Sequence, residues 1–360
     1  MKVYISFIIT IILGLFILQL LYPFKPHAIF FDFNNEEIID LINKQKDDVN
    51  ETFIQPTYKS NKLNLSNFNF EGKCREPFKY KPNNERDLIF TGIKYKSNYK
   101  WKKHKKTIEE SSNIMKNTIP NVKKVCVLYE NDNELKGFIE NCGFEVIQTN
   151  INSDGKTIIN PAIDRFVELN KYLNEHEGEF DRVALIDFRD VFFYADGFQT
   201  ISNDEVVFSE ECVHRQYYDT ICIDYRQRTN YRWLKKCYGR KIAKQYRRER
   251  KRVNNVGIII GGIKPFKELL DVFIEEIKRK QDVLHIWGID NAMINYLRYS
   301  GSFEGINVTI NTYSQRLAFE WNGGYIYDKE NKAVKDMLDG CSPIIRHKIN
   351  GQDLFALLNE

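Results

Sequence analysis

The sequence has no closely spaced cysteine pair, no internal repeat, no heptad pattern and only six histidines among 360 residues. Without a Cys-x-x-Cys pair, a zinc-finger type of site is not expected. The lack of repeats and heptads excludes solenoids and coiled coils. The few scattered histidines disfavour a metal-dependent phosphodiesterase, which needs a denser set of His and Asp ligands.

No strong excess of one charge is present either. The net charge of +4 is small for this length and argues against a general nucleic-acid binder. The basic residues are concentrated in residues 226–252, which carry thirteen Lys or Arg and a single acid, Glu249. Two interpretations stay open for this segment: a lip that attracts an anionic substrate, or a solvated helical insertion, which is the simpler one.

Residues 4–22 lack any charged side chain and are strongly apolar. Their length is close to the roughly 20 residues that span a bilayer as a helix. No Ala-x-Ala cleavage pattern follows, so we expect an uncleaved signal-anchor. Residues 1–3 would then form a cytosolic tail, and the rest would lie in a lumen or outside the cell, as in a single-pass type II membrane protein.

Residues 23–85 show little helical or strand periodicity, which predicts a partly disordered stem. Glycosylation acceptor triplets begin at Asn50, Asn64 and Asn307 and agree with a lumenal glycoprotein. In an oxidising lumen some of the seven cysteines would pair. We expect the folded domain to occupy residues 86–360.

Short apolar runs alternate with amphipathic helical patterns along this domain. Such an order predicts an α/β fold with a mainly parallel central sheet, flanking helices and right-handed crossovers. The expected strands cover residues 87–92, 123–129, 144–148, 183–186 and 205–209, and a further strand lies within 254–262.

The most informative strand ends at Asp187, and Asp190 follows three residues later. Ligands of open α/β sheets bind beyond the carboxyl ends of strands. Two carboxylates there offer hard oxygen ligands for Mg²⁺ or Mn²⁺, which a diphosphate-bearing donor requires. The alternative is that Asp-x-x-Asp forms only a turn or a helix N-cap.

Three later stretches each have a functional and a simpler interpretation. The glycines of residues 254–262 allow a ligand to lie against bare backbone, or they only end a strand. Asp290 orients or deprotonates an acceptor hydroxyl, or it only complements a helix dipole. His347 is a third metal ligand through its neutral imidazole, or an ordinary hydrogen-bonded histidine.

In this order, the stretches Asp187-Phe-Arg-Asp190, Asn255-Val-Gly-Ile-Ile-Ile-Gly-Gly262, Asp290-Asn291 and His347-Lys-Ile-Asn-Gly351 resemble GT-A fold, Rossmann-like glycosyltransferases. The nearest pattern is the glycosyltransferase domain of procollagen lysyl hydroxylase. This resemblance implies that Asp187, Asp190 and His347 bind Mn²⁺ or Mg²⁺. It also implies that Thr91, Gly92, Arg189, Lys348 and Gly351 contact the nucleotide and its phosphates, that Asn255, Gly261 and Gly262 contact the sugar, and that Asp290 is catalytic.

The sequence departs from the family at three of these places. Arg189 adds a residue to the usual Asp-x-Asp motif, and Asn291 replaces a Gln that usually follows the acid. The stretch from His347 to Gly351 has one residue more than the family's His-x-Asn-Gly. The resemblance implies a transferase that moves a sugar from a nucleotide-diphosphate sugar, UDP-sugar above all, to a hydroxyl on a glycan, protein or lipid. The alternative is a non-catalytic lumenal or surface binding protein on a degenerate version of the same fold.

Overall fold

The computed structural model describes residues 53–95, 101–149, 160–211, 228–311, 316–319, 325–337 and 339–347. All of them belong to the second of two units, which spans residues 48–360. The expected membrane segment 4–22 lies outside the described residues. Among the helices that are described, none is long and apolar enough to cross a membrane.

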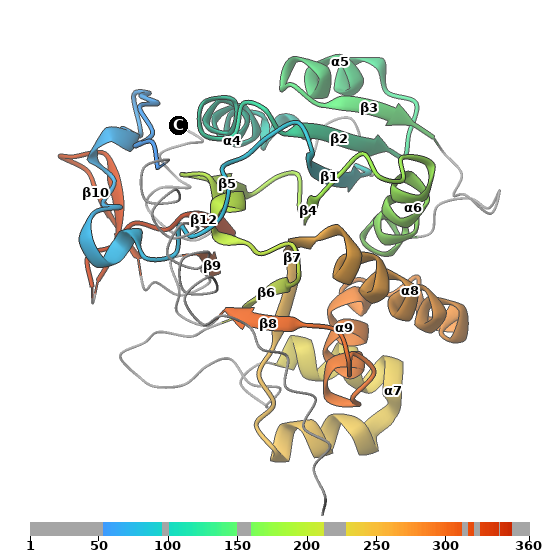
Figure 1. Cartoon of the computed structure of the whole chain (residues 1–360). Coiled ribbons are helices and arrows are strands. Elements are labelled where there is room, and N and C mark those ends of the chain that lie inside the picture. Colours follow the sequence, from blue (N-terminus) through green and yellow to red (C-terminus); the bar gives the residue numbers. More distant parts are fainter. Residues whose placement is uncertain are drawn as a thin grey trace, which may run out of the picture. The chain divides into compact units, whose positions relative to one another are not determined.

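A seven-stranded sheet forms the centre of this unit, with the strand order β3-β2-β1-β4-β7-β6-β8 (Figure 1). All neighbouring pairs are parallel except those of β7, which runs antiparallel to both β4 and β6. The expected mainly parallel α/β sheet is therefore confirmed, with one reversed strand that the sequence analysis did not predict. The strands are β1 (Asp87–Ile93), β2 (Lys123–Leu128), β3 (Glu145–Gln148), β4 (Arg182–Ile186), β6 (Val206–Glu210), β7 (Asn254–Gly262) and β8 (Val308–Asn311).

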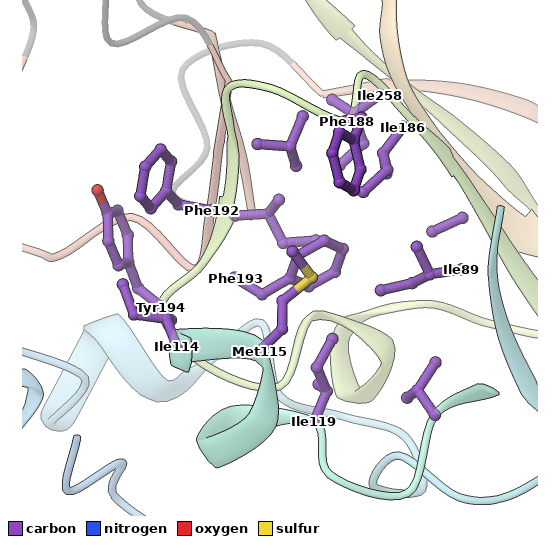
Figure 2. Packing of buried hydrophobic residues seen from close by; sticks show 14 of the residues in the cluster. Ile89, Ile114, Met115, Ile119, Ile186, Phe188, Phe192, Phe193, Tyr194 and Ile258 are labelled. Atoms are coloured by element: carbon purple, nitrogen blue, oxygen red, sulfur yellow. The ribbon is translucent and has the colours of Figure 1, made fainter. Parts of the chain in front are cut away.

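Helices cover both faces of the sheet, because successive side chains of its buried strands point to opposite sides. In β4, Ala184 and Ile186 join the cluster under α4 and α5, whereas Val183 and Leu185 join the cluster under α6, α8 and α9. The helices are α4 (Lys105–Thr118), α5 (Asn133–Asn141), α6 (Pro161–Glu175), α8 (Ile263–Arg279) and α9 (Ile289–Tyr299). Figure 2 shows part of the first cluster, where Met115 of α4 lies beside Phe193.

The basic segment forms α7 (Arg228–Arg248), which contains a kink at Gly239, where φ is +83°. Its apolar residues Leu234, Ala243 and Tyr246 are buried, and the helix packs against α9. Most of its Lys and Arg side chains are exposed. This arrangement is that of a solvated helical insertion.

A second, three-stranded sheet lies beside the first and consists of β5 (Val191–Phe193), β12 (Ile345–His347) and β9 (Leu317–Phe319). β12 pairs antiparallel with β5, so that His347 lies opposite Val191. This pairing brings the end of the described chain next to Asp190. A separate two-stranded sheet contains β10 (Tyr325–Asp328) and β11 (Ala333–Asp336).

Residues 53–85, which were expected to belong to a stem, form part of the folded core instead. Leu63, Leu65 and Phe70 are fully buried in the same cluster as the sheet residues. A disulfide joins Cys74 to Cys341, just before β12. The boundary expected at residue 86 is therefore corrected: irregular segments with short 3₁₀ turns carry no periodicity, yet their apolar side chains still pack into the core.

Removal of the Cys74–Cys341 disulfide is predicted to destabilise the fold. The bond closes a separation of 267 residues, and loss of a native disulfide costs about 2–5 kcal/mol of unfolding free energy. Urea unfolding of the Cys74→Ser/Cys341→Ser variant measures this loss. As a control, dithiothreitol should destabilise the wild-type chain and leave the double variant unchanged. Equal stability of the variant and the oxidised wild type would contradict the prediction.

Candidate metal centre

The Asp187–Asp190 turn lies at the carboxyl end of β4 and is held by a backbone hydrogen bond and by packing in the core. The amide of Asp187 donates to the carbonyl of Gly257 at 2.8 Å, which continues the pairing of β4 with β7. Phe188, one of the two residues between the acids, is buried near Ile186 and Ile258 (Figure 2) and anchors the turn in the core. Asp190 is buried, whereas the side chain of Asp187 remains 33% exposed.

His347 meets this turn through the pairing of β12 with β5. Its Nε2 lies 3.3 Å from Oδ2 of Asp187 and 3.6 Å from Oδ1 of Asp190, and its side chain is 1% exposed. Ligand atoms of these three residues all lie within 4.8 Å of one another. The structure therefore brings together the three residues that the sequence analysis assigned to a metal site, although His347 follows Asp190 by 157 positions (347 − 190) along the chain.

Gly257 makes room for the imidazole. A Cβ at this position would lie 1.8 Å from Cε1 and 2.5 Å from Nε2 of His347, so the ring rests against bare backbone. Any side chain there would displace the histidine from the two aspartates. The sequence predicted that a ligand could lie against bare backbone in this stretch. In the structure, the space beside Gly257 is occupied by the His347 side chain.

The donor set fits a divalent cation. Two carboxylates and one imidazole offer three ligands from rigid strand ends, which leaves positions for substrate oxygens. The packing around His347 and Phe188 holds the donors in place before a cation arrives. The same three ligands suit either Mn²⁺ or Mg²⁺.

Arg165 of α6 joins the candidate metal centre to a third acid. Its Nη1 donates to Oδ1 of Asp187 at 2.6 Å, and its Nη2 donates to the carbonyl of Val256 at 2.9 Å. Nη2 also lies 3.8 Å from Oδ2 of Asp290, and the side chain is 3% exposed. Sequence reasoning missed this residue, although an arginine between Ile163 and Phe166 on the buried face of a helix was a visible signal.

Asp290 lies in the first turn of α9 and is buried. Burial raises its pKa to about 6, against the opposing effect of the Arg165 charge. The carboxylate is thus ionised at neutral pH and can take up a proton in a mildly acidic range. This behaviour suits the role of a group that orients or deprotonates a hydroxyl.

A cleft of about 330 Å³ opens at this edge of the sheet. Its lining includes Gly92 and Tyr95 from the end of β1, the Asp187–Asp190 turn, and Trp287 before α9. Arg189 faces this cleft. Burial by itself would lower the pKa of Arg189. The carboxylates of Asp190 and Asp187 outweigh this effect, so that the pKa is raised. The cleft therefore carries a permanent cation beside the acidic turn.

The two predicted nucleotide residues of β1 are placed differently. Gly92 lines the cleft, and a Cβ there would meet Cβ of Arg165 at 2.9 Å, so close packing requires a glycine. Thr91 is fully buried, and its hydroxyl donates to the carbonyl of Ile186 at 2.8 Å. Thr91 therefore joins β1 to β4 below the cleft. Lys348 and Gly351, predicted to bind phosphate, lie outside the described residues.

Gly261 and Gly262, predicted to contact the sugar, do not lie at this edge of the sheet. Gly262 pairs with Arg182 at the start of β4, the end opposite Asp187. A Cβ on Gly262 would lie 1.7 Å from the carbonyl oxygen of Asn203, so these glycines permit close backbone packing. The expectation is corrected because β7 is antiparallel: its first residues, and not its last, lie near Asp187 and His347.

Asn255, the third predicted sugar residue, is at the correct end of β7 but is buried in a polar network. Its Oδ1 accepts from the amide of Gly257 at 2.8 Å, and its Nδ2 donates to Glu211 at 2.9 Å. The Glu211 carboxylate also accepts hydrogen bonds from the side-chain Nδ2 of Asn230 at 3.0 Å and of Asn291 at 3.4 Å. Asn255 thereby supports the backbone beneath His347. Glu211 had no recognisable signal in the sequence, because its partners come from three separate elements.

Comparisons with known proteins give only distant similarities. The structure is similar to that of an active-site mutant of LgtC, with 14% identity, a TM-score of 0.40, and coverage of 73% of this chain and 87% of that one. It is also similar to a glycosyltransferase involved in the glycosylation of the major capsid of PBCV-1, with 11% identity, a TM-score of 0.35, and coverage of 76% and 96%. No family model and no curated protein matches the sequence.

A Gly257→Ala substitution is predicted to weaken cation binding without unfolding the chain. The added methyl group displaces the imidazole of His347, and disturbing the support of a metal ligand costs about 10–100-fold in affinity. Titration with Mn²⁺, followed by the electron paramagnetic resonance signal of the free ion, measures this. Gly137→Ala is the matched control, because a Cβ there meets nothing within 4 Å. Wild-type Mn²⁺ affinity in the Gly257 variant would refute the proposed role.

An Asp290→Asn substitution is predicted to change how stability depends on pH. The folded state holds the Asp290 proton more tightly than the unfolded state, so the resulting stabilisation is present near pH 4 and is lost as the pH rises through about 6. Relative to the variant, the wild type should lose about 2–3 kcal/mol of unfolding free energy between pH 4 and pH 7.5.

Urea unfolding in EDTA at several pH values measures this difference. Asp271→Asn, on the exposed face of α8, controls for the loss of one charge. A difference between wild type and Asp290→Asn that does not vary with pH would contradict the prediction.

Proposed function

We propose that the protein is a divalent-metal-dependent glycosyltransferase with a GT-A type fold. It would move a sugar from a nucleoside-diphosphate sugar to a hydroxyl acceptor on a glycan, protein or lipid. The observation that carries this proposal is the convergence of Asp187, Asp190 and His347 at the carboxyl end of β4, beside the cleft that the two aspartates line. Cofactor sites of α/β sheets lie at this position, and two acids with one imidazole suit a cation that binds diphosphate.

When bound, the cation would neutralise the negative charge that develops as the nucleoside diphosphate leaves. The chain's own groups would prepare the site for this event. Arg165 fixes one oxygen of Asp187 and leaves the other facing His347. Arg189 adds positive charge to the cleft wall, where it would attract phosphate oxygens. Asp290 would accept a hydrogen bond or a proton from the attacking hydroxyl.

The size of the cleft agrees with a small-molecule donor. Its volume of about 330 Å³ is at the lower end of the range typical of ligand pockets. Its lining combines apolar and aromatic groups with a few charged ones. UDP-sugars with Mn²⁺ are the first donor and cofactor to test, because the sequence resemblance points to them.

We also propose that residues 4–22 anchor the protein in the membrane and that the folded unit faces the lumen of the Golgi or ER. The Cys74–Cys341 disulfide supports this orientation, because such bonds persist in oxidising compartments. Residues 23–52 would then form the tether.

Metal removal and an Asp190→Asn substitution should each reduce turnover strongly. The measurement is release of nucleoside diphosphate by the full-length chain from a panel of UDP- and GDP-sugars with Mn²⁺, with and without EDTA. Loss of metal-assisted charge stabilisation is expected to lower the rate on the order of 10²–10⁴-fold.

Asp271→Asn again serves as the control and should keep wild-type turnover. Unchanged activity after both EDTA treatment and Asp190→Asn would remove the metal from the mechanism. Binding of UDP and Mn²⁺ without turnover of any sugar nucleotide would instead favour a binding protein.

A further inference from the structure

One large aromatic side chain remains exposed at the active-site cleft. Trp287 is 73% exposed, whereas the other tryptophans of the described residues are buried, as Trp101 is, or half-buried, as Trp233 is. A single exposed apolar residue on a protein surface is common and needs no function. Trp287, however, lines the same cleft as Asp187 and Asp190.

The turn that carries Trp287 is anchored on both sides. Nδ2 of Asn160 donates to the carbonyls of Leu284 at 2.8 Å and of Ile286 at 3.2 Å. Gly288 has a φ of +78°, a value that favours glycine. A Cβ at Gly288 would lie 2.1 Å from the ring of Trp233, so the turn lies directly on this indole.

This anchoring separates the role of the turn from that of the exposed ring. Asn160, Gly288 and Trp233 fix the backbone, and they do so without help from the side chain of Trp287. A rigid aromatic surface loses little conformational entropy when it binds a ligand. The turn therefore holds the backbone of Trp287 in place and presents its flat apolar ring to the cleft.

The position of the ring assigns it to the acceptor side. β4, with the acidic turn at its end, lies between β1 and β7 in the sheet. Gly92 and Tyr95 line the cleft from the end of β1, which is the side expected to receive the nucleotide. Trp287 comes three residues before Asp290, the carboxylate proposed to orient the acceptor hydroxyl.

We infer that Trp287 is a stacking platform for a sugar ring of the acceptor, so that the acceptor is a glycan. One face of a pyranose ring presents C–H groups to an aromatic surface, while the hydroxyls at its edge stay free for the acid. A lone serine or threonine hydroxyl of a protein acceptor would leave the platform without a ligand. This inference rests on the proposed glycosyltransferase activity and narrows its acceptor class.

Direct binding tests the platform without requiring turnover. Tryptophan fluorescence of the full-length chain is titrated with lactose, maltose and the methyl glycosides of glucose, galactose, mannose and xylose, in the presence of UDP and Mn²⁺. At least one saccharide should change the emission at millimolar concentration. The change should disappear in Trp287→Ala and persist at weaker affinity in Trp287→Phe.

Tyr80→Ala is the matched control, because Tyr80 is an exposed aromatic residue that does not line the cleft. Its variant should bind saccharide as the wild type does. Absence of any saccharide response, or an equal response in Trp287→Ala, overturns the inference. If the emission changes with UDP alone in a Trp287-dependent way, and does not change with any saccharide, the ring binds the nucleotide. That result also overturns the inference.

Kinetics provide the second measurement. The saccharides that bind are used as acceptors. Trp287→Ala should raise the acceptor KM at least tenfold and change the donor KM less than threefold. Trp287→Phe should return the acceptor KM most of the way to the wild-type value. Equal changes in both KM values would overturn the acceptor assignment. If the wild type turns over no sugar nucleotide, the proposed function fails, and the saccharide titration still decides whether Trp287 binds a sugar.

Discussion

The pairing of β12 with β5 is the constraint on which the candidate metal centre depends. β5 begins directly after Asp190, and the register of the pair places His347 opposite Val191. A one-residue slip would turn the imidazole to the other face of the sheet. The Cys74–Cys341 disulfide and the hydrogen bonds between Asn69 and Ser342 hold the chain just before β12. The segment expected to be a stem thus stabilises the strand that carries the third ligand.

Charge balance is the second constraint at this edge of the sheet. Asp187 and Asp190 line the cleft, and Asp290 is buried close to Arg165. Carboxylates near one another are unfavourable without nearby positive charge. Arg165 supplies part of that charge from within the fold, and Arg189 supplies part from the cleft wall. A bound divalent cation would supply more. The acids are therefore positioned at a site where a cation both fits the ligands and relieves their repulsion.

Much of the fold was predictable because its signals are local. Buried strands and amphipathic helices show their periodicity within a few residues, and the mainly parallel sheet followed from their alternation. Residues 53–85 were missed as part of the core because 3₁₀ turns and irregular chain have no such period. The role of Gly261 and Gly262 was misplaced for another reason: sequence does not reveal strand direction. In the antiparallel β7, Gly257 and Asn255 are the residues near the metal centre.

The sequence by itself determined which side chains were available: two acids at the end of a buried strand, an acid in the first turn of a helix, and a late histidine. These are properties of short segments, and short-range patterns report them. Only the tertiary structure decided that these groups meet, that Arg165 contacts two of the acids, that Glu211 holds Asn255 beneath the histidine, and that Trp287 is exposed at the cleft. Such contacts depend on the register and direction of strands far apart in the chain, which are set by packing of the whole domain.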